Sequence, residues 1–261
     1  MKTQLLITIA TLCLCFSGMS VTRPSNLATS TSDWPQWRGP RRDGISEEKG
    51  LLKQWPAQGP KLLWQVEDIG DGYSTPAVVG TRIYLVSNRG FENEFVQALS
   101  SEDGKPVWTT RLGNVGNQSD FLYSKARSTP TVDGDSIYAL GSAGDLACLE
   151  TGSGKIRWQK NLKKEFGGQP GFWAYAESPL VDGDTLVATP GGAQATIVAL
   201  NKKTGALIWK SAVPGGDPAA YASAILLEGN VYGFSHTAEE KMIDSLQAVS
   251  LTVSSHEQAV L

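Results

Sequence analysis

The chain has few of the residues that usually carry cofactors, metals or disulfides. It contains 2 histidines and 3 cysteines in 261 residues, and Cys13 and Cys15 both lie in an apolar N-terminal run. If that run is removed, Cys148 remains alone, which excludes an intrachain disulfide. Cys148 lies in the apolar stretch LACL, so we expect a buried and inert thiol. We assign no catalytic residue and no metal ligand from the sequence.

A strong charge of one sign and a long hydrophobic run are also missing. The 23 Lys and Arg nearly balance the 26 Asp and Glu, for a net charge of −3, and no basic stripe suggests a nucleic-acid partner. The apolar run LLITIATLCLCF is shorter than the ~20 residues that span a bilayer. We therefore expect no transmembrane segment in the mature chain.

The N-terminus has the pattern of a secretory signal. Lys2 precedes the apolar run, and the small residues SGMS follow it, which predicts cleavage after Ser20. A membrane anchor is the alternative interpretation. The signal predicts export to the periplasm or the extracellular space. Residues 21–32 are rich in Ser and Thr and are expected to be a linker.

A repeat of about 50 residues organises the rest of the chain. Its first landmark is a Gly followed four residues later by a Trp, in the pairs Gly104 and Trp108, Gly154 and Trp158, and Gly205 and Trp209. Its second landmark is Thr-Pro or Ser-Pro with a Gly four residues after the Pro, in TPAVVG, TPTVDG and SPLVDG. The two landmarks keep the same phase in three copies, and AILLEG begins a partial fourth. We infer a repeat architecture over residues 33–234.

Each repeat holds four short apolar stretches divided by Gly or Asp turns. The second copy shows them as STPTV, DSIYAL, DLACLE and KIRWQKNL. The stretches are too short for helices, and the middle ones are apolar at successive positions, as strands covered on both faces are. Four strands in about 50 residues predict an all-β fold, a β-propeller of four-stranded antiparallel blades.

Two features invite a ligand-binding interpretation. TGSGKIRW resembles a phosphate-binding loop, but Ile156 stands where the hydroxyl residue would be and a strand follows, so we interpret it as a hairpin turn. The three repeated Trp rings could stack on a planar ligand. Their fixed register favours a structural role between neighbouring blades.

The order Ser-x-Pro-x-Val-x-Gly, then Ala-Leu, then Thr-Gly-Lys-x-x-Trp resembles the pyrroloquinoline-quinone (PQQ) repeat propellers. The opening DWPQWRGPRRDGIS is similar to the start of secreted bacterial members. The resemblance implies one of two functions. Some members are dehydrogenases of alcohols or sugars that bind PQQ and calcium, often beneath an adjacent Cys pair. Others, such as the BamB-type subunit of the outer-membrane assembly machinery, are scaffolds without a catalytic function.

The number of repeats predicts an incomplete ring of about four blades. KLLWQV, ending near Trp64, is a degenerate match to one further outer strand at the start. Residues 235–261 lack the repeat, and TAEEKMIDSLQAV within them has helical spacing and a capping box. This tail is a native helix that covers the open blade edge, the out-of-frame end of a truncated gene, or a sign that two copies pair into one closed ring. The sequence leaves these alternatives open.

The loops that enter the first strand of each blade carry the candidate binding residues. They open onto one rim, and their aromatic and charged residues are Tyr73, Arg127, Trp173, Tyr175, Glu177 and Tyr221. Glu177 stands where other copies have Ser, and Arg127 lies in the neighbouring repeat at similar height. The set is either a binding rim or an inter-blade ion pair among packed aromatic rings.

Together these features favour an exported, non-catalytic scaffold or binding module that needs no cofactor and presents its rim to protein partners of the cell envelope. The alternative is a fragment of a PQQ-dependent quinoprotein dehydrogenase, with PQQ and calcium bound.

Overall fold

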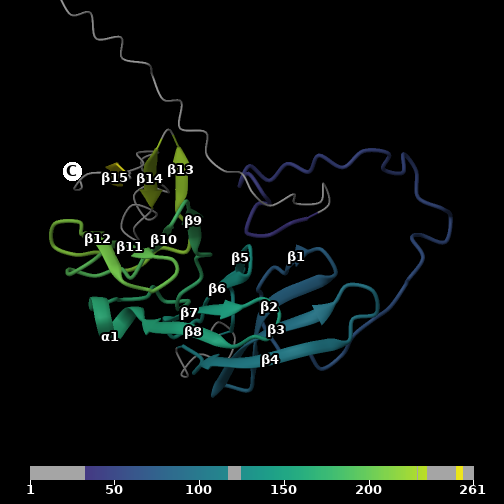
Figure 1. The fold of residues 1–261 in the computed structure, drawn as a ribbon, viewed down its shortest axis with the longest axis horizontal. Helices are drawn as coiled ribbons and strands as arrows, with labels where there is room; N and C mark the ends of the chain where they lie inside the picture. The colour runs from purple at the N-terminus through teal and green to yellow at the C-terminus, as the bar shows by residue number, and fades with distance from the viewer. Residues whose placement is uncertain (1–32, 117–124, 228, 234–250, 255–261) are drawn as a thin grey trace, which may run out of the picture.

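The computed structural model describes residues 33–116, 125–227, 229–233 and 251–254. Three four-stranded antiparallel sheets and one three-stranded sheet follow one another around an arc (Figure 1). We call them blades 1 to 4, and each is a meander whose strands pair with their neighbours in sequence. The all-β architecture of an incomplete propeller predicted from the repeat is confirmed.

The strands match the repeat. Blade 1 contains β1 (Ala77–Val79), β2 (Arg82–Arg89), β3 (Asn93–Ser100) and β4 (Pro106–Gly113). Blade 2 contains β5 (Thr131–Asp133), β6 (Ser136–Leu140), β7 (Asp145–Glu150) and β8 (Ile156–Asn161). Blade 3 contains β9 (Leu180–Asp182), β10 (Thr185–Ala188), β11 (Ile197–Asn201) and β12 (Leu207–Ser211). Blade 4 contains β13 (Ile225–Leu227), β14 (Asn230–Gly233) and β15 (Leu251–Ser254).

One short helix interrupts this pattern. The predicted strand KIRWQKNL ends one residue early, because Asn161 caps α1 (Leu162–Phe166) by accepting a hydrogen bond from the Lys164 amide at 3.1 Å. Gly167 ends the helix in the left-handed conformation, with φ of 66°. The buried side chains of Leu162 and Phe166 anchor the helix to the core formed by blades 2 and 3.

The hydrophobic core lies between successive blades. One cluster joins blade 1 residues such as Val86 to Ile137 and Leu149 of blade 2. A second joins Leu146 of blade 2 to Leu200 of blade 3, and a third joins blades 3 and 4. Every residue of β6 is buried. The middle strands are apolar at successive positions because each of their faces meets a different blade.

The repeated Trp and Gly form one contact that recurs from blade to blade. The indole of Trp108 donates a hydrogen bond to the Thr151 carbonyl at 3.0 Å, and Trp158 donates to Lys202 at 2.9 Å. The Trp108 ring covers Gly154, whose φ of 70° suits glycine and where a Cβ atom would lie 2.4 Å from Trp108 Cε3. Trp108 and Trp158 thus each dock an indole onto the glycine turn of the next blade.

Residues 61–66 were predicted as an outer strand and do not form one in the structure. Trp64 nevertheless makes the same contact as the repeat Trp residues, because its indole donates to the Ser101 carbonyl at 3.1 Å and covers Gly104. The segment therefore occupies the position of an outer strand that would precede blade 1. Its side chains Leu62 and Leu63 are 71% and 79% exposed.

The segment 33–44 crosses the innermost strands of the blades. Trp34 exchanges two backbone hydrogen bonds with Val78 of blade 1, and the Pro35 carbonyl accepts from Val132 of blade 2. Arg42 then donates to Pro179, just before β9, and to Ala224, just before β13. This segment ties all four blades together.

Three predicted regions lie outside the described residues: the signal at 1–20, the linker at 21–32 and the helix expected at 237–249. Within the tail, β15 pairs antiparallel with β14 as the third strand of blade 4. In the part of the chain that the structure describes, no helix is both long and apolar enough to cross a bilayer.

Candidate functional site

Four of the six predicted rim residues come together at the entry to the blades. The Arg127 guanidinium lies 4.8 Å from the centre of the Tyr73 ring and 5.9 Å from that of Trp173. The Trp173 and Tyr221 rings are 4.9 Å apart, and the Trp173 amide donates to the Tyr221 hydroxyl. We call Tyr73, Arg127, Trp173 and Tyr221 the aromatic rim.

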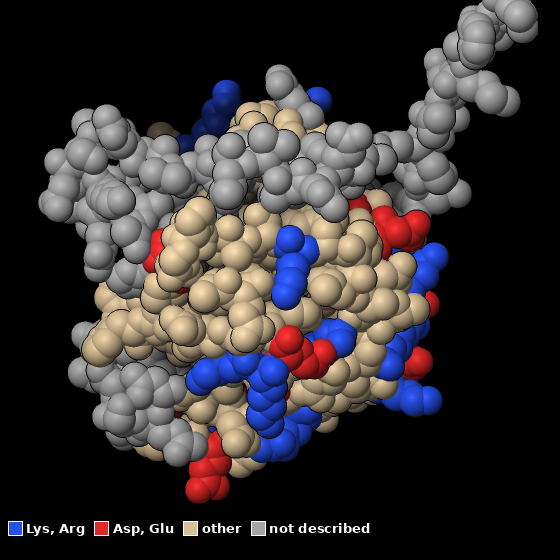
Figure 2. Space-filling model, turned by 90° about the vertical axis from the view of Figure 1, so that its left-hand side faces the viewer, with Lys and Arg blue, Asp and Glu red and all other residues tan. Residues whose placement is uncertain are grey.

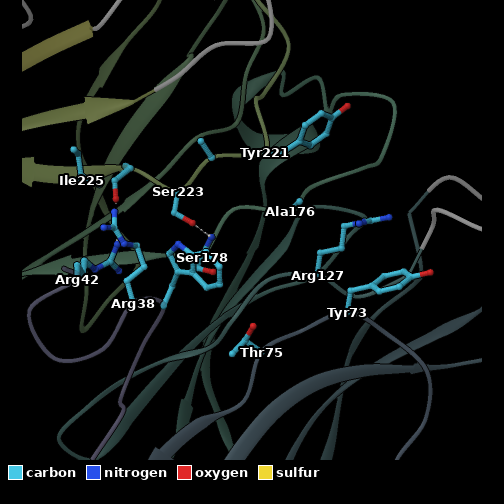
Figure 3. Close-up of a pocket in the computed structure, with 13 residues that line it drawn as sticks. Arg38, Arg42, Tyr73, Thr75, Arg127, Ala176, Ser178, Tyr221, Ser223 and Ile225 are labelled. Carbon is cyan, nitrogen blue, oxygen red and sulfur yellow. Dashed lines mark hydrogen bonds between the residues drawn. The ribbon is translucent and has the colours of Figure 1, made fainter. Parts of the chain in front are cut away.

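A cavity of about 630 Å³ opens beside the aromatic rim (Figure 3). Tyr73, Arg127 and Tyr221 line it together with the loops before β9 and β13. Its other wall comes from the N-terminal segment, through Arg38 and Arg42. Cations therefore stand at both ends of the cavity, and aromatic and aliphatic side chains lie between them.

The remaining predicted residues, Tyr175 and Glu177, lie inside the fold, where each is 1% exposed, and neither lines the cavity. The Tyr175 hydroxyl donates to the Pro190 carbonyl at 2.8 Å. Burial raises the pKa of Tyr175, and the nearby Glu177 carboxyl raises it further.

Glu177 performs the task that serine performs in blade 1. Its carboxyl oxygen accepts a hydrogen bond from the Thr189 amide, as the Ser74 hydroxyl accepts from the Val86 amide two blades earlier. Burial raises the pKa of Glu177 to about 7, while the Thr189 hydrogen bonds and the charge of Arg42 act in the opposite direction. The cation that influences Glu177 is thus supplied by the N-terminal segment.

Arg42 has an unusual environment for a cation. Its guanidinium donates to the Gln36 side chain at 2.8 Å and to the carbonyls of Ala224 at 3.1 Å and Pro179 at 2.6 Å. Loss of water around it lowers its pKa to about 10, against the favourable influence of Glu177. The sequence contained the signal for this wall of the cavity, the basic cluster in WRGPRR. Repeat alignment missed it because the cluster precedes the first repeat.

Among the described residues, no group of three or more His, Cys, Asp or Glu side chains is arranged to hold a metal ion. Cys148 is fully buried in β7, where burial raises the pKa of its thiol, so it cannot reach the cavity. On the face seen in Figure 2, acidic side chains and uncharged surface interrupt the Lys and Arg, and no basic stripe crosses it.

Comparison with known proteins gives a consistent result. The family model described as outer membrane protein assembly factor BamB matches residues 44–189, more than half of the chain. The BamB of Moranella endobia is 31% identical over 119 residues, which cover 45% of this chain and 28% of that protein. The BamB of Yersinia pestis is 26% identical over 156 residues, 58% of this chain and 36% of the relative. The chain thus spans about a third of the length of these relatives.

Solved structures agree on the fold. BamB from Moraxella catarrhalis superposes with a TM-score of 0.51 at 18% identity, over 70% of this chain and 51% of that chain. A quinohemoprotein alcohol dehydrogenase from Comamonas testosteroni superposes with a TM-score of 0.58 at 15% identity, over 88% of this chain and 40% of that chain. The sheets, the repeat contacts and the family match together establish that the chain belongs to the BamB-type family of PQQ-repeat β-propellers.

Proposed function

We propose that the protein is an exported, non-catalytic propeller scaffold that binds protein partners of the cell envelope through its aromatic rim. The observation that carries this proposal is the rim itself. Tyr73 and Trp173 are 57% and 41% exposed although each lies against Arg127. Trp, Tyr and Arg are the residues that dominate binding energy at protein interfaces, especially when a rigid scaffold presents them.

Membership of the BamB-type family also supports the scaffold proposal. The relatives that match are named as outer membrane assembly factors, and that role comes to this chain as part of the proposal. The N-terminal signal pattern supports export, and location in the periplasm or outside the cell follows from it.

Photocrosslinking in envelope preparations of the native host tests the scaffold role. A photoreactive residue replaces Phe172, which is 61% exposed beside the rim, and in a control protein it replaces Leu207, which is 46% exposed on β12. We expect discrete protein adducts from position 172 that disappear when Trp173→Ala is added. Equal adducts from both positions, or adducts unaffected by Trp173→Ala, would contradict the proposal.

The competing function, a fragment of a quinoprotein dehydrogenase, has its own test. PQQ with calcium should change the tryptophan fluorescence and support reduction of an electron-accepting dye by alcohols or sugars if this function is correct. A scaffold should do neither. Dye reduction by the purified protein would overturn the non-catalytic assignment.

We also propose that two copies can close one ring. Blade 4 has three strands among the described residues, and residues 61–66 hold an outer-strand position next to blade 1 without a sheet of their own. The segment of one copy is therefore suited to complete blade 4 of the other. Light scattering coupled to size exclusion on residues 21–261 should show a compact dimer that Leu63→Lys weakens. A monomer would contradict ring closure by a second copy.

A further inference from the structure

The cavity beside the aromatic rim has cationic groups at both ends. Arg38 and Arg42 stand at one end, Arg127 stands at the other, and the side chain of Arg127 points away from the pair (Figure 3). These cations come from two separate parts of the chain, the N-terminal segment and the loop before β5. The fold, and not a local run of basic residues, brings them to one cavity.

Arg42 still has hydrogen-bonding capacity at this cavity. Its three hydrogen bonds to described residues go to neutral acceptors. Since a guanidinium has five N–H groups, two of them have no acceptor in the part of the chain that the structure describes. Among the residues that the structure describes, no carboxylate lies within ion-pair distance of Arg38 or Arg42. A partly desolvated cation is costly without a counter-charge, and an anion that enters the cavity would supply one.

The backbone at Arg38 and Arg42 is held in a rarely used conformation. Arg38 has φ of 63° and Arg42 has φ of 57°, and such left-handed values are uncommon for residues other than glycine. The Gly44 amide donates to the Arg38 carbonyl at 2.9 Å, which closes the turn. Backbone strain of this kind persists only where the surrounding structure holds it, and it is concentrated at functional sites. Here the turn directs two guanidinium groups to the same cavity wall.

The lining between the cations is suited to apolar groups. Trp37 is 41% exposed in the cavity wall, and Tyr73, Tyr221 and Ile225 complete that surface. A volume of about 630 Å³ lies within the range of sites that hold a small ligand or a few peptide residues. An occupant that matches both features carries negative charges separated by apolar side chains.

We propose that this cavity binds an acidic peptide segment of a partner protein, with one carboxylate on Arg38 and Arg42 and a second close to Arg127. The inference rests on the proposed scaffold function and names the chemistry by which a partner would be recognised. Guanidinium groups bind carboxylates in charge-assisted, often bidentate hydrogen bonds, which favours arginine for this task.

Fluorescence anisotropy with two labelled hexapeptides tests the proposal on the full mature chain. One peptide alternates Glu and Leu, and the other replaces every Glu with Gln. We expect the Glu peptide to bind at least about tenfold more tightly, with an affinity that falls as salt rises. Equal affinities for the two peptides, or no binding of the Glu peptide, would overturn the proposal.

Substitutions then locate the site. Arg38→Gln and Arg127→Gln should each weaken binding of the Glu peptide about tenfold, because each removes one charged contact. Arg41→Gln is the matched control, since Arg41 adjoins the same turn but pairs with Asp43 and does not line the cavity. Thermal melting of each variant checks that it is folded. If Arg41→Gln weakens binding as much as Arg38→Gln, the site is not this cavity.

Two further results separate the possible sources of failure. Free citrate that competes at the affinity of the Glu peptide would assign the site to small polycarboxylates, and the peptide assignment would be wrong. Crosslinks from position 172 that persist while the two peptides bind equally would leave the scaffold function standing and would overturn only the carboxylate chemistry. If position 172 gives no crosslinks in the protein that keeps Trp173, that result would count against the scaffold function itself.

Discussion

Glu94 is a carboxyl group buried between blades 1 and 2, and it should make the stability of the protein depend on pH. It is 0% exposed, and one of its oxygens accepts from the amide and the hydroxyl of Ser142, at 2.8 and 3.2 Å. Burial raises its pKa from 4.5 to about 8; the Ser142 hydrogen bonds oppose this effect and the charge of Asp145 adds to it. The folded protein therefore keeps the proton over a pH range where the unfolded chain has lost it.

The sign and size follow from linkage. Between pH 4.5 and about 8 the folded state binds more protons than the unfolded state, so the free energy of unfolding falls as pH rises. For this single group the loss between pH 5 and pH 7 is about 2–3 kcal/mol, given about 1.4 kcal/mol for each unit of pKa difference. Glu94→Gln removes the ionisation but keeps an oxygen that can accept from Ser142.

Urea unfolding followed by tryptophan fluorescence at pH 5 and pH 7 measures the effect. The free energy of unfolding of Glu94→Gln, relative to that of wild type, should rise by about 2–3 kcal/mol from pH 5 to pH 7, whatever constant offset the substitution adds. Glu102→Gln, in an exposed turn after β3, is the control and should keep the wild-type dependence. If the curves of wild type and Glu94→Gln run parallel, Glu94 is not a protonated carboxyl in the folded state and the reasoning fails.

Three further predictions concern the blade contact and the cavity. Gly154→Ala should destabilise the protein by about 1–3 kcal/mol in urea unfolding, because its Cβ atom would meet the Trp108 ring, whereas Gly152→Ala, with open space around it, should stay within about 0.5 kcal/mol of wild type. Arg42→Ala should lower the free energy of unfolding by about 1–3 kcal/mol in the same assay, because two carbonyls of different blades lose a charged donor. An unchanged urea midpoint would show that these two hydrogen bonds do not stabilise the fold. The Glu peptide should bind severalfold more tightly at pH 6 than at pH 8. Glu177, with a pKa of about 7, is protonated at pH 6 and then no longer compensates the charge of Arg42. Glu177→Gln should abolish the pH difference, and a difference that persists in this variant would exclude Glu177 as its cause.

The repeat pattern predicted most of the fold because it reports local chemistry. Glycine turns at fixed spacing set the hairpins, and apolar runs without alternation predicted strands covered on both faces. The pattern did not predict α1, because this one-turn helix depends on a single N-cap residue, Asn161, and an Asn at the end of a strand is not distinctive in the sequence. It also treated residues 61–66 as a strand, whereas the structure preserves only the docking contact of Trp64.

The candidate site was predicted less completely than the fold. Tyr73, Arg127, Trp173 and Tyr221 do meet, because the loops that enter successive blades open onto the same rim. Position in the repeat could not show how deeply a side chain enters the fold. Glu177 looked like a rim charge because it replaces a serine, but it takes over the hydrogen bond of that serine and lies buried.

The sequence by itself determined the blades, their order and the indoles that join blade 1 to blade 2 and blade 2 to blade 3, since all of these depend on residues at fixed positions in the repeat. Only the tertiary structure decided where the N-terminal segment runs and which charges share a cavity. Arg42 lies 137 residues before Pro179 and 182 before Ala224, and no spacing within the repeats relates them. Contacts of that kind arise from closure of the chain around the blade arc, because an unsatisfied carbonyl before each inner strand needs a donor and a desolvated guanidinium needs acceptors.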